Sequence, residues 1–195
     1  SIMLHALITR PDLRDRVRGW APVQAPFLGS HIADLASSRG AASLLWLFGG
    51  TRETADAMTT ARAREYQKRH RKAIAAVLRA VPVVAFASWV DTSAPRWLLL
   101  VNPLLKWTWD AISRSGGRND ILVPVKSAVL PGMAFIAVPG VDHLAPFVDT
   151  QTAFDRVRFL KTLLTMLLRR EPGRRPLRPR ARAPRTPPLP RLVPP

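Results

Sequence analysis

The chain has no cysteine among its 195 residues, and its 13 acidic residues are far outnumbered by 30 lysines and arginines. Without cysteine it can form no disulfide, no thiolate metal site and no cysteine nucleophile. The excess of basic residues gives a formal net charge of +17, which permits attraction to nucleic acid or to anionic lipid. The four histidines show no spacing that suggests a metal site, so no metal is expected.

Long uninterrupted apolar runs are also lacking. The strongest, Ile74 to Val90, is broken by Arg79 and Pro82, and is too short and too broken to predict a membrane span. No signal peptide is visible at the start. The chain opens on Ser1 inside an expected helix, where a natural start would carry Met, so we expect a trimmed or incomplete N-terminus. Cytoplasmic and secreted locations both stay open.

Residues 172–195 differ in composition from the rest. They contain nine prolines and seven arginines and no acidic residue. Such a segment buries too little apolar surface to offset its ordering entropy, so we expect a disordered basic tail. No recognition motif accompanies the charge, so no specific nucleic-acid partner is expected. Weak contact with an anionic membrane remains an expected consequence of the charge.

The length suggests one domain or slightly more, with strands and helices alternating along it. Apolar periodicity and glycine or proline breaks predict helices and strands as follows. Helices are expected at 2–9, in part of 31–48, at 52–80 and at 152–170, and strands at 17–27, 81–90 and 133–138. Between the last two strands come a Trp- and Leu-rich segment at 95–112 and a loop at 115–120. This order indicates an α/β fold with a parallel sheet covered on both faces.

Two loops carry side chains suited to catalysis, 116–124 and 139–143. Each lies at the edge of a predicted strand, and open α/β sheets place their sites at the carboxyl ends of strands. The first loop contains Asp120 and the second contains His143. A carboxylate can orient an imidazole and stabilise its protonated form, while the imidazole serves as general base and acid.

These motifs, in order, resemble those of bacterial triacylglycerol lipases and related α/β-hydrolases. The acid loop of those enzymes is similar to Asn119-Asp120-x-x-Val-Pro. Their histidine loop is similar to the one that carries His143, which lies 23 positions after Asp120. The segment 25–34, APFLGSHIAD, resembles the T-P-H-x-G-S-x-x-A-D segment that they carry one strand after the nucleophile. Pro11-Asp12-Leu13, which precedes this segment, also fits the pattern of those lipases. The resemblance covers roughly residues 1–168.

The resemblance implies the C-terminal half of an α/β-hydrolase fold, with a partial domain over residues 1–171 and a cap-like segment at about 95–115. It also implies a triad in the order serine, acid, histidine, with Asp120 as the acid and His143 as the base. The nucleophile should lie on a G-x-S-x-G elbow. No such motif occurs in the 195 residues, and the family's spacing places it a few residues upstream of Ser1. The chain alone is therefore expected to be inactive.

The activity that the resemblance implies is hydrolysis of a carboxylic ester through an acyl-enzyme, with no cofactor. The substrate would be a small-molecule or lipid ester. Trp97, Leu98 and Trp107 lie in the region that contributes to the cap and acyl pocket of lipases, which favours an apolar acyl group.

Three residues have competing interpretations. Asp91 is the rival acid, because it follows the predicted strand 81–90. Asp142, beside the histidine, is expected to be an exposed loop carboxylate. Ser30 is the tempting nucleophile within the chain, but its motif lacks the second glycine of the elbow and the resemblance gives it a structural role.

Two other functions stay open. The first is a catalytically inactive hydrolase-like fragment that binds a partner or a membrane. The second is a basic nucleic-acid-binding protein. The sequence leaves the oligomeric state open.

Overall fold

The computed structural model describes residues 2–37, 51–91, 103–148 and 154–168. Two strands, β1 (Val84–Trp89) and β2 (Ala134–Pro139), pair in parallel, with Val84 opposite Ala134 and Trp89 opposite Pro139. The helices are α1 (Ile2–Thr9), α2 (His31–Ser37), α3 (Arg52–Ala57), α4 (Thr60–Ala80), α6 (Pro103–Gly116) and α7 (Arg156–Leu168). Two short 3-10 turns, η1 (Pro11–Leu13) and η3 (Val125–Ser127), complete the set. The basic tail predicted for 172–195 lies outside the described residues.

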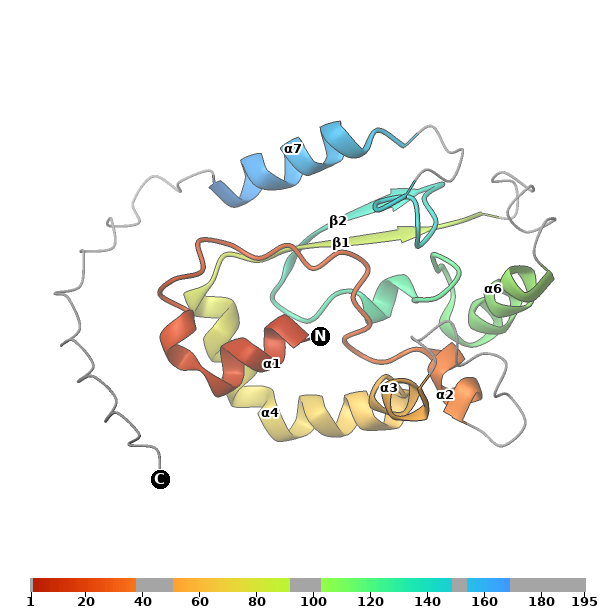
Figure 1. The fold of residues 1–195 in the computed structure, drawn as a ribbon, viewed down its shortest axis with the longest axis horizontal. Coiled ribbons are helices and arrows are strands. Elements are labelled where there is room, and N and C mark those ends of the chain that lie inside the picture. Colours follow the sequence, from red (N-terminus) through yellow and green to blue (C-terminus); the bar gives the residue numbers. More distant parts are fainter. Residues whose placement is uncertain (1, 38–50, 92–102, 149–153, 169–195) are drawn as a thin grey trace, which may run out of the picture.

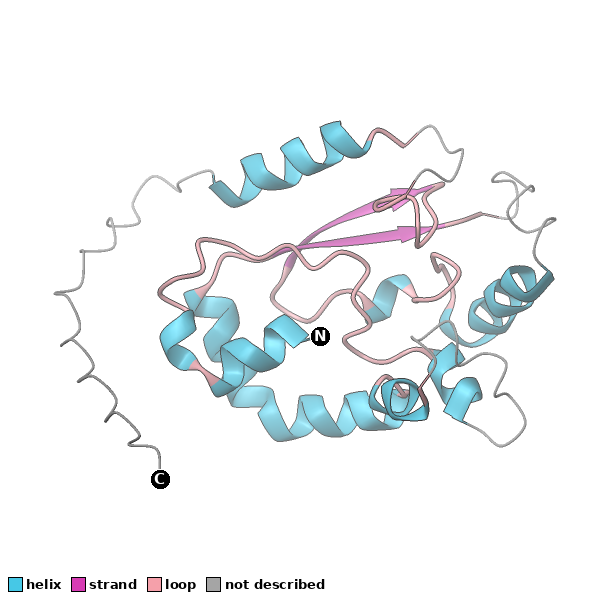
Figure 2. Ribbon diagram, viewed as in Figure 1, coloured by secondary structure: helices cyan, strands magenta, loops and turns pink. Residues whose placement is uncertain are grey.

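Helices cover the pair of strands on both sides (Figure 1), as the sequence predicts. α7 lies along one face, and α1 and α4 lie on the other. Figure 2 distinguishes the helices, strands and loops by colour. On the α7 side, the ring of Phe86 packs on Phe159 with ring centroids 4.5 Å apart. On the other side, Ala85 joins a larger core.

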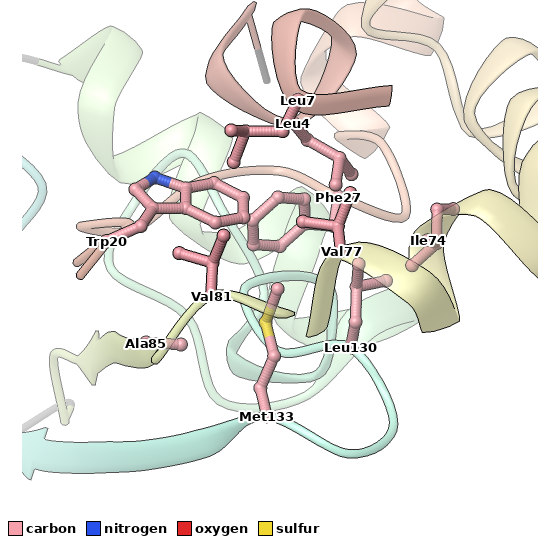
Figure 3. Close-up of a cluster of buried hydrophobic side chains, with 10 residues drawn as sticks. All are labelled: Leu4, Leu7, Trp20, Phe27, Ile74, Val77, Val81, Ala85, Leu130 and Met133. Carbon is pink, nitrogen blue, oxygen red and sulfur yellow. The ribbon is translucent and has the colours of Figure 1, made fainter. Parts of the chain in front are cut away.

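That larger core lies between α1, α4 and the sheet (Figure 3). Leu4 and Leu7 of α1 are almost fully buried and face α4 and the segment that carries Trp20 and Phe27. The two aromatic rings meet edge to face at 5.7 Å. The remaining members are Ile74, Val77, Val81, Ala85, Leu130 and Met133. Residues far apart in the sequence thus form one packed cluster, which fixes α1 against the sheet.

The strand expected at 17–27 is not a regular strand. It runs parallel to β1 through two isolated bridges, Trp20 to Val83 and Val23 to Phe86. Proline at 22 has no N–H to donate, and Gln24 adopts a left-handed conformation with φ 49°. These two residues interrupt the ladder, so the segment contacts β1 without forming a strand of its own.

The single long helix expected at 52–80 is also wrong, because the chain breaks between α3 and α4. The Met58 carbonyl accepts the N–H of Ser30 at 2.9 Å, and the Thr59 hydroxyl caps α4. The Asp34 carboxylate accepts the N–H of Thr60 at 2.8 Å. Tertiary partners from the segment 29–34 therefore impose the break, and no local glycine or proline marks it.

α7 begins and ends within the predicted range, but its apolar residues do not all face the core. Leu163 is buried, at 3% exposure, whereas Leu160 and Leu164 are 53% and 55% exposed. The helix is apolar on two sides, so periodicity alone could not say which side packs on the sheet.

Candidate active site

The loop 116–124, called the acid loop, is hydrogen-bonded to the carboxyl end of β1, although Asn119 lies 29 positions after Val90 in the sequence. The N–H of Val90, next after β1, donates to the Asn119 carbonyl at 2.9 Å. Asn119 itself is fully buried: its side-chain oxygen accepts the N–H of Ile121 at 2.9 Å and its amide nitrogen donates to the Ser113 hydroxyl. This asparagine-centred turn places Asp120 where the sheet ends.

Both oxygens of the Asp120 carboxylate are engaged. Oδ1 accepts the backbone N–H of Leu122 at 3.0 Å and that of Val123 at 2.7 Å. Oδ2 lies 2.9 Å from Nδ1 of His143. The Asp120 side chain is 1% exposed and that of His143 is 26% exposed. Two donors on one oxygen fix the plane of the carboxylate, so its second oxygen is aimed at the imidazole.

The loop after β2 delivers His143. Gly140, with φ 74°, turns the chain, and its N–H donates to the Trp89 carbonyl at 2.8 Å. The N–H of His143 donates to the Asp120 carbonyl at 2.9 Å. The two loops are therefore joined twice, once through their backbones and once through the carboxylate and imidazole.

Asp142 is buried, at 3% exposure, which corrects the expectation of an exposed carboxylate. Its Oδ1 accepts the N–H of Leu144 at 2.8 Å and that of Ala145 at 3.0 Å. It thus closes the turn that follows His143, a local role typical of aspartate.

Burial of the imidazole acts to lower the pKa of His143, but the hydrogen bond that Nδ1 donates to Asp120 and the negative charges of Asp120 and Asp142 outweigh burial, so the pKa is raised. The raised pKa means that the protonated imidazole is stabilised at this position. A histidine whose protonated form is stabilised by a buried carboxylate can serve in general acid and base catalysis.

Asp91, the rival acid, is exposed at the end of β1. The carboxylate that contacts the imidazole is that of Asp120. The structure therefore brings Asp120 and His143 together, and their roles in catalysis stay predictions.

Ser30 is almost fully buried, at 2% exposure. Its hydroxyl donates to the Leu122 carbonyl at 2.7 Å and accepts the N–H of Ile32 at 3.3 Å. A hydroxyl committed in this way to the acid loop is placed for a structural role, as the resemblance implied.

Of the three residues expected to bind the acyl group, Trp97 and Leu98 lie outside the described residues. Trp107 lies on α6 and is 42% exposed. α6 contacts the end of β1, where the indole N–H of Trp109 donates to the Val90 carbonyl at 3.0 Å. Trp107 is thus on an element attached to the candidate site.

Within the part of the chain that the structure describes, no group of three or more histidine, aspartate or glutamate residues could hold a metal ion. In the same residues, no helix combines the length and the apolar character needed to cross a bilayer.

No protein-family model and no curated protein matches the chain. Solved structures do. The mature form of lipase BlEst2 from Bacillus licheniformis matches with a TM-score of 0.65 and 17% identity, over 84% of this chain and 60% of that one. The metagenomic carboxyl esterase MGS0156 matches with a TM-score of 0.64 and 21% identity, over 84% of this chain and 52% of that one. The propeptide form of BlEst2 matches with a TM-score of 0.61 and 18% identity, over 84% of this chain and 32% of that one.

Over 84% of its length the chain therefore shares part of the α/β-hydrolase fold of these lipase and esterase structures, as its motifs predicted. It spans less than two thirds of the length of each of these proteins, which are 60%, 52% and 32% covered.

Proposed function

We propose that this chain supplies the acid and the base of a serine hydrolase that acts on carboxylic esters. Asp120 is the acid and His143 the base, and the nucleophilic serine comes from a part of the fold outside this chain. One observation carries the proposal. Asp120 Oδ2 and His143 Nδ1 lie 2.9 Å apart, with the carboxylate buried at the carboxyl end of β1.

The pair can perform both proton transfers of ester hydrolysis. Because Nδ1 faces a carboxylate, it carries the proton, which leaves Nε2 free to accept one. Nε2 of His143 removes the proton from the serine hydroxyl as its oxygen attacks the ester carbonyl, and then donates it to the leaving alcohol. Water, activated in the same way, releases the acid and regenerates the serine. Asp120 keeps its charge throughout and stabilises the imidazolium.

The substrate that we propose is a small-molecule or lipid ester with an apolar acyl group. The half-exposed indole of Trp107, on a helix that contacts the end of β1, supports this proposal. Large apolar side chains beside convergent polar groups are typical of ester-binding pockets.

The coding DNA upstream of Ser1 tests the proposal. We expect an open frame that encodes strand-like segments and then G-x-S-x-G within a few residues of Ser1. The extended protein should hydrolyse p-nitrophenyl esters and react with a fluorophosphonate at the elbow serine. An upstream frame without an elbow, or an extended protein that neither labels nor hydrolyses esters, would overturn it.

A second function has two observations in its favour. α7 exposes the apolar side chains of Val157, Leu160, Leu164 and Leu168, each more than half exposed, and the chain is strongly basic. These features suit a catalytically inactive hydrolase-like protein that binds a partner or an anionic membrane. Cosedimentation with anionic but not neutral vesicles, by a protein without an upstream elbow, would favour this function over hydrolysis.

A further inference from the structure

Gln24 is a buried glutamine placed between β1 and the histidine loop. It is 1% exposed and its backbone N–H donates to the Phe86 carbonyl at 2.8 Å. Its side-chain nitrogen donates to the Ser88 hydroxyl at 2.6 Å and to the Asp142 carbonyl at 2.9 Å. Since a carbonyl can only accept, the contact with Asp142 fixes which end of the amide faces the loop.

Two features of Gln24 are unfavourable for folding. The residue has a φ of 49°, a backbone conformation that residues other than glycine adopt at a cost in free energy. Its Oε1 is buried and has no hydrogen-bond partner among the residues that the structure describes, which also costs free energy. The gain from this side chain must therefore lie in the hydrogen bonds that its nitrogen donates.

The bond to Asp142 acts on the peptide group that joins Asp142 to His143. The carbonyl of this peptide group is held by Gln24, and its N–H donates to the Asp120 carbonyl at 2.9 Å. A peptide group is planar, so fixing both of its polar atoms fixes the plane from which the His143 side chain departs. The imidazole is then directed at Asp120 Oδ2.

We propose that Gln24 is a positioning residue for His143: its amide holds the Asp142–His143 peptide group so that the imidazole meets the Asp120 carboxylate. Gln24 acts through this peptide group and not by contact with the imidazole. Its use in ester hydrolysis rests on the proposed function, whereas its effect on the imidazole can be measured without any substrate.

The test compares Gln24→Met with Gln67→Met in the full chain. Met keeps the length and the unbranched Cβ of glutamine but cannot donate. Gln67 is the matched control, because its Nε2 also donates to a backbone carbonyl, that of Phe27 at 3.2 Å, away from the histidine loop. The readout is the pKa of His143, followed by NMR of the imidazole carbons. The charged groups that face the imidazole, Asp120 and Asp142, are unchanged in both variants.

In Gln24→Met we expect the proton affinity of His143 to fall by about threefold or more, because an imidazole less well aligned with the Asp120 carboxylate gains less from it, and the effect of burial is then less opposed. Gln67→Met should leave it unchanged. An unchanged His143 pKa in a folded Gln24→Met protein would overturn the proposal, whatever the result of an esterase assay.

Should Gln24→Met fail to fold, hydrogen exchange in the wild-type chain tests the proposal instead. The side-chain amide protons of Gln24 should exchange with solvent more slowly than those of Gln67, because both of their acceptors are buried. Equal exchange rates would show that the amide does not hold the loop, and the proposal would fall.

Discussion

The hydroxyl of Ser30 donates a 2.7 Å hydrogen bond to the carbonyl of Leu122, which lies 92 positions further along the chain. The N–H of the same Leu122 donates to Asp120 Oδ1 at 3.0 Å. Ser30 therefore supports the peptide segment that orients the candidate acid. The serine of the segment 25–34 and the Asn-Asp loop, two separate sequence motifs, form one structural unit.

Ser30→Ala should lower the free energy of unfolding by about 1–3 kcal/mol, because it leaves a partly buried carbonyl without its donor. Chemical denaturation measures the change. Ser115→Ala is the control, since that exposed hydroxyl only bonds within its own helix, and it should alter stability by less than about 0.5 kcal/mol. Equal effects of the two substitutions would contradict the supporting role of Ser30.

Gly29→Ala should destabilise the fold by about 2 kcal/mol or more. Gly29 has a φ of 84°, and an added Cβ would lie 2.6 Å from the Cα of Thr60 and 2.7 Å from its nitrogen, at the start of α4. Gly117→Ala is the matched control. Gly117 has a similar φ of 76° but nothing within 4 Å of an added Cβ, so it should cost only about 1 kcal/mol. Thermal denaturation of both variants separates steric contact from backbone conformation.

Asp120→Asn should lower the pKa of His143, since it removes the hydrogen-bonded charge that raises this pKa and leaves burial, which lowers it. The raised pKa in the folded state also predicts a pH dependence of stability. The stabilisation from the protonated imidazole is complete below the unfolded pKa of about 6.5, and is lost as pH rises through the higher folded value. The difference in unfolding free energy between wild type and Asp120→Asn should therefore shrink as pH rises through that interval. A difference that grows with pH would contradict this.

The exposed side of α7 should make the isolated chain associate. Replacing Leu160 and Leu164, which are 53% and 55% exposed, by Ala should shift sedimentation velocity profiles towards monomer and leave the unfolding free energy nearly unchanged. Leu163→Ala, on the buried side at 3% exposure, should instead cost about 2–5 kcal/mol. Association that persists after both exposed leucines are removed would point to another surface.

Local patterns were sufficient for the fold class and for several elements. Alternating strands and helices predicted the covered parallel sheet. The helix predicted at 2–9 is α1 (Ile2–Thr9), and the strands predicted at 81–90 and 133–138 overlap β1 (Val84–Trp89) and β2 (Ala134–Pro139). The break at Met58 was not predicted, because the partners that hold it, Ser30 and Asp34, come from another part of the chain.

The site followed from motifs only in part. The resemblance to the acid and histidine loops of lipases implied that Asp120 and His143 would be partners, and the structure places Asp120 Oδ2 2.9 Å from His143 Nδ1. The buried roles of Asn119, Asp142 and Gln24 were missed, because each depends on backbone groups brought close by folding. For Gln24 a signal was present: an amide inside an otherwise apolar segment is more often satisfied by folding than left in solvent.

The most direct test of the acid and base assignment is kcat/KM for p-nitrophenyl ester hydrolysis by the protein extended upstream through the elbow. Asp120→Asn and His143→Ala should each lower it by about 10³–10⁴-fold, while Asp91→Asn should leave it within about twofold of wild type. Loss of activity in Asp91→Asn with retention in Asp120→Asn would contradict the account, because the carboxylate that contacts His143 would then not be the one that serves catalysis.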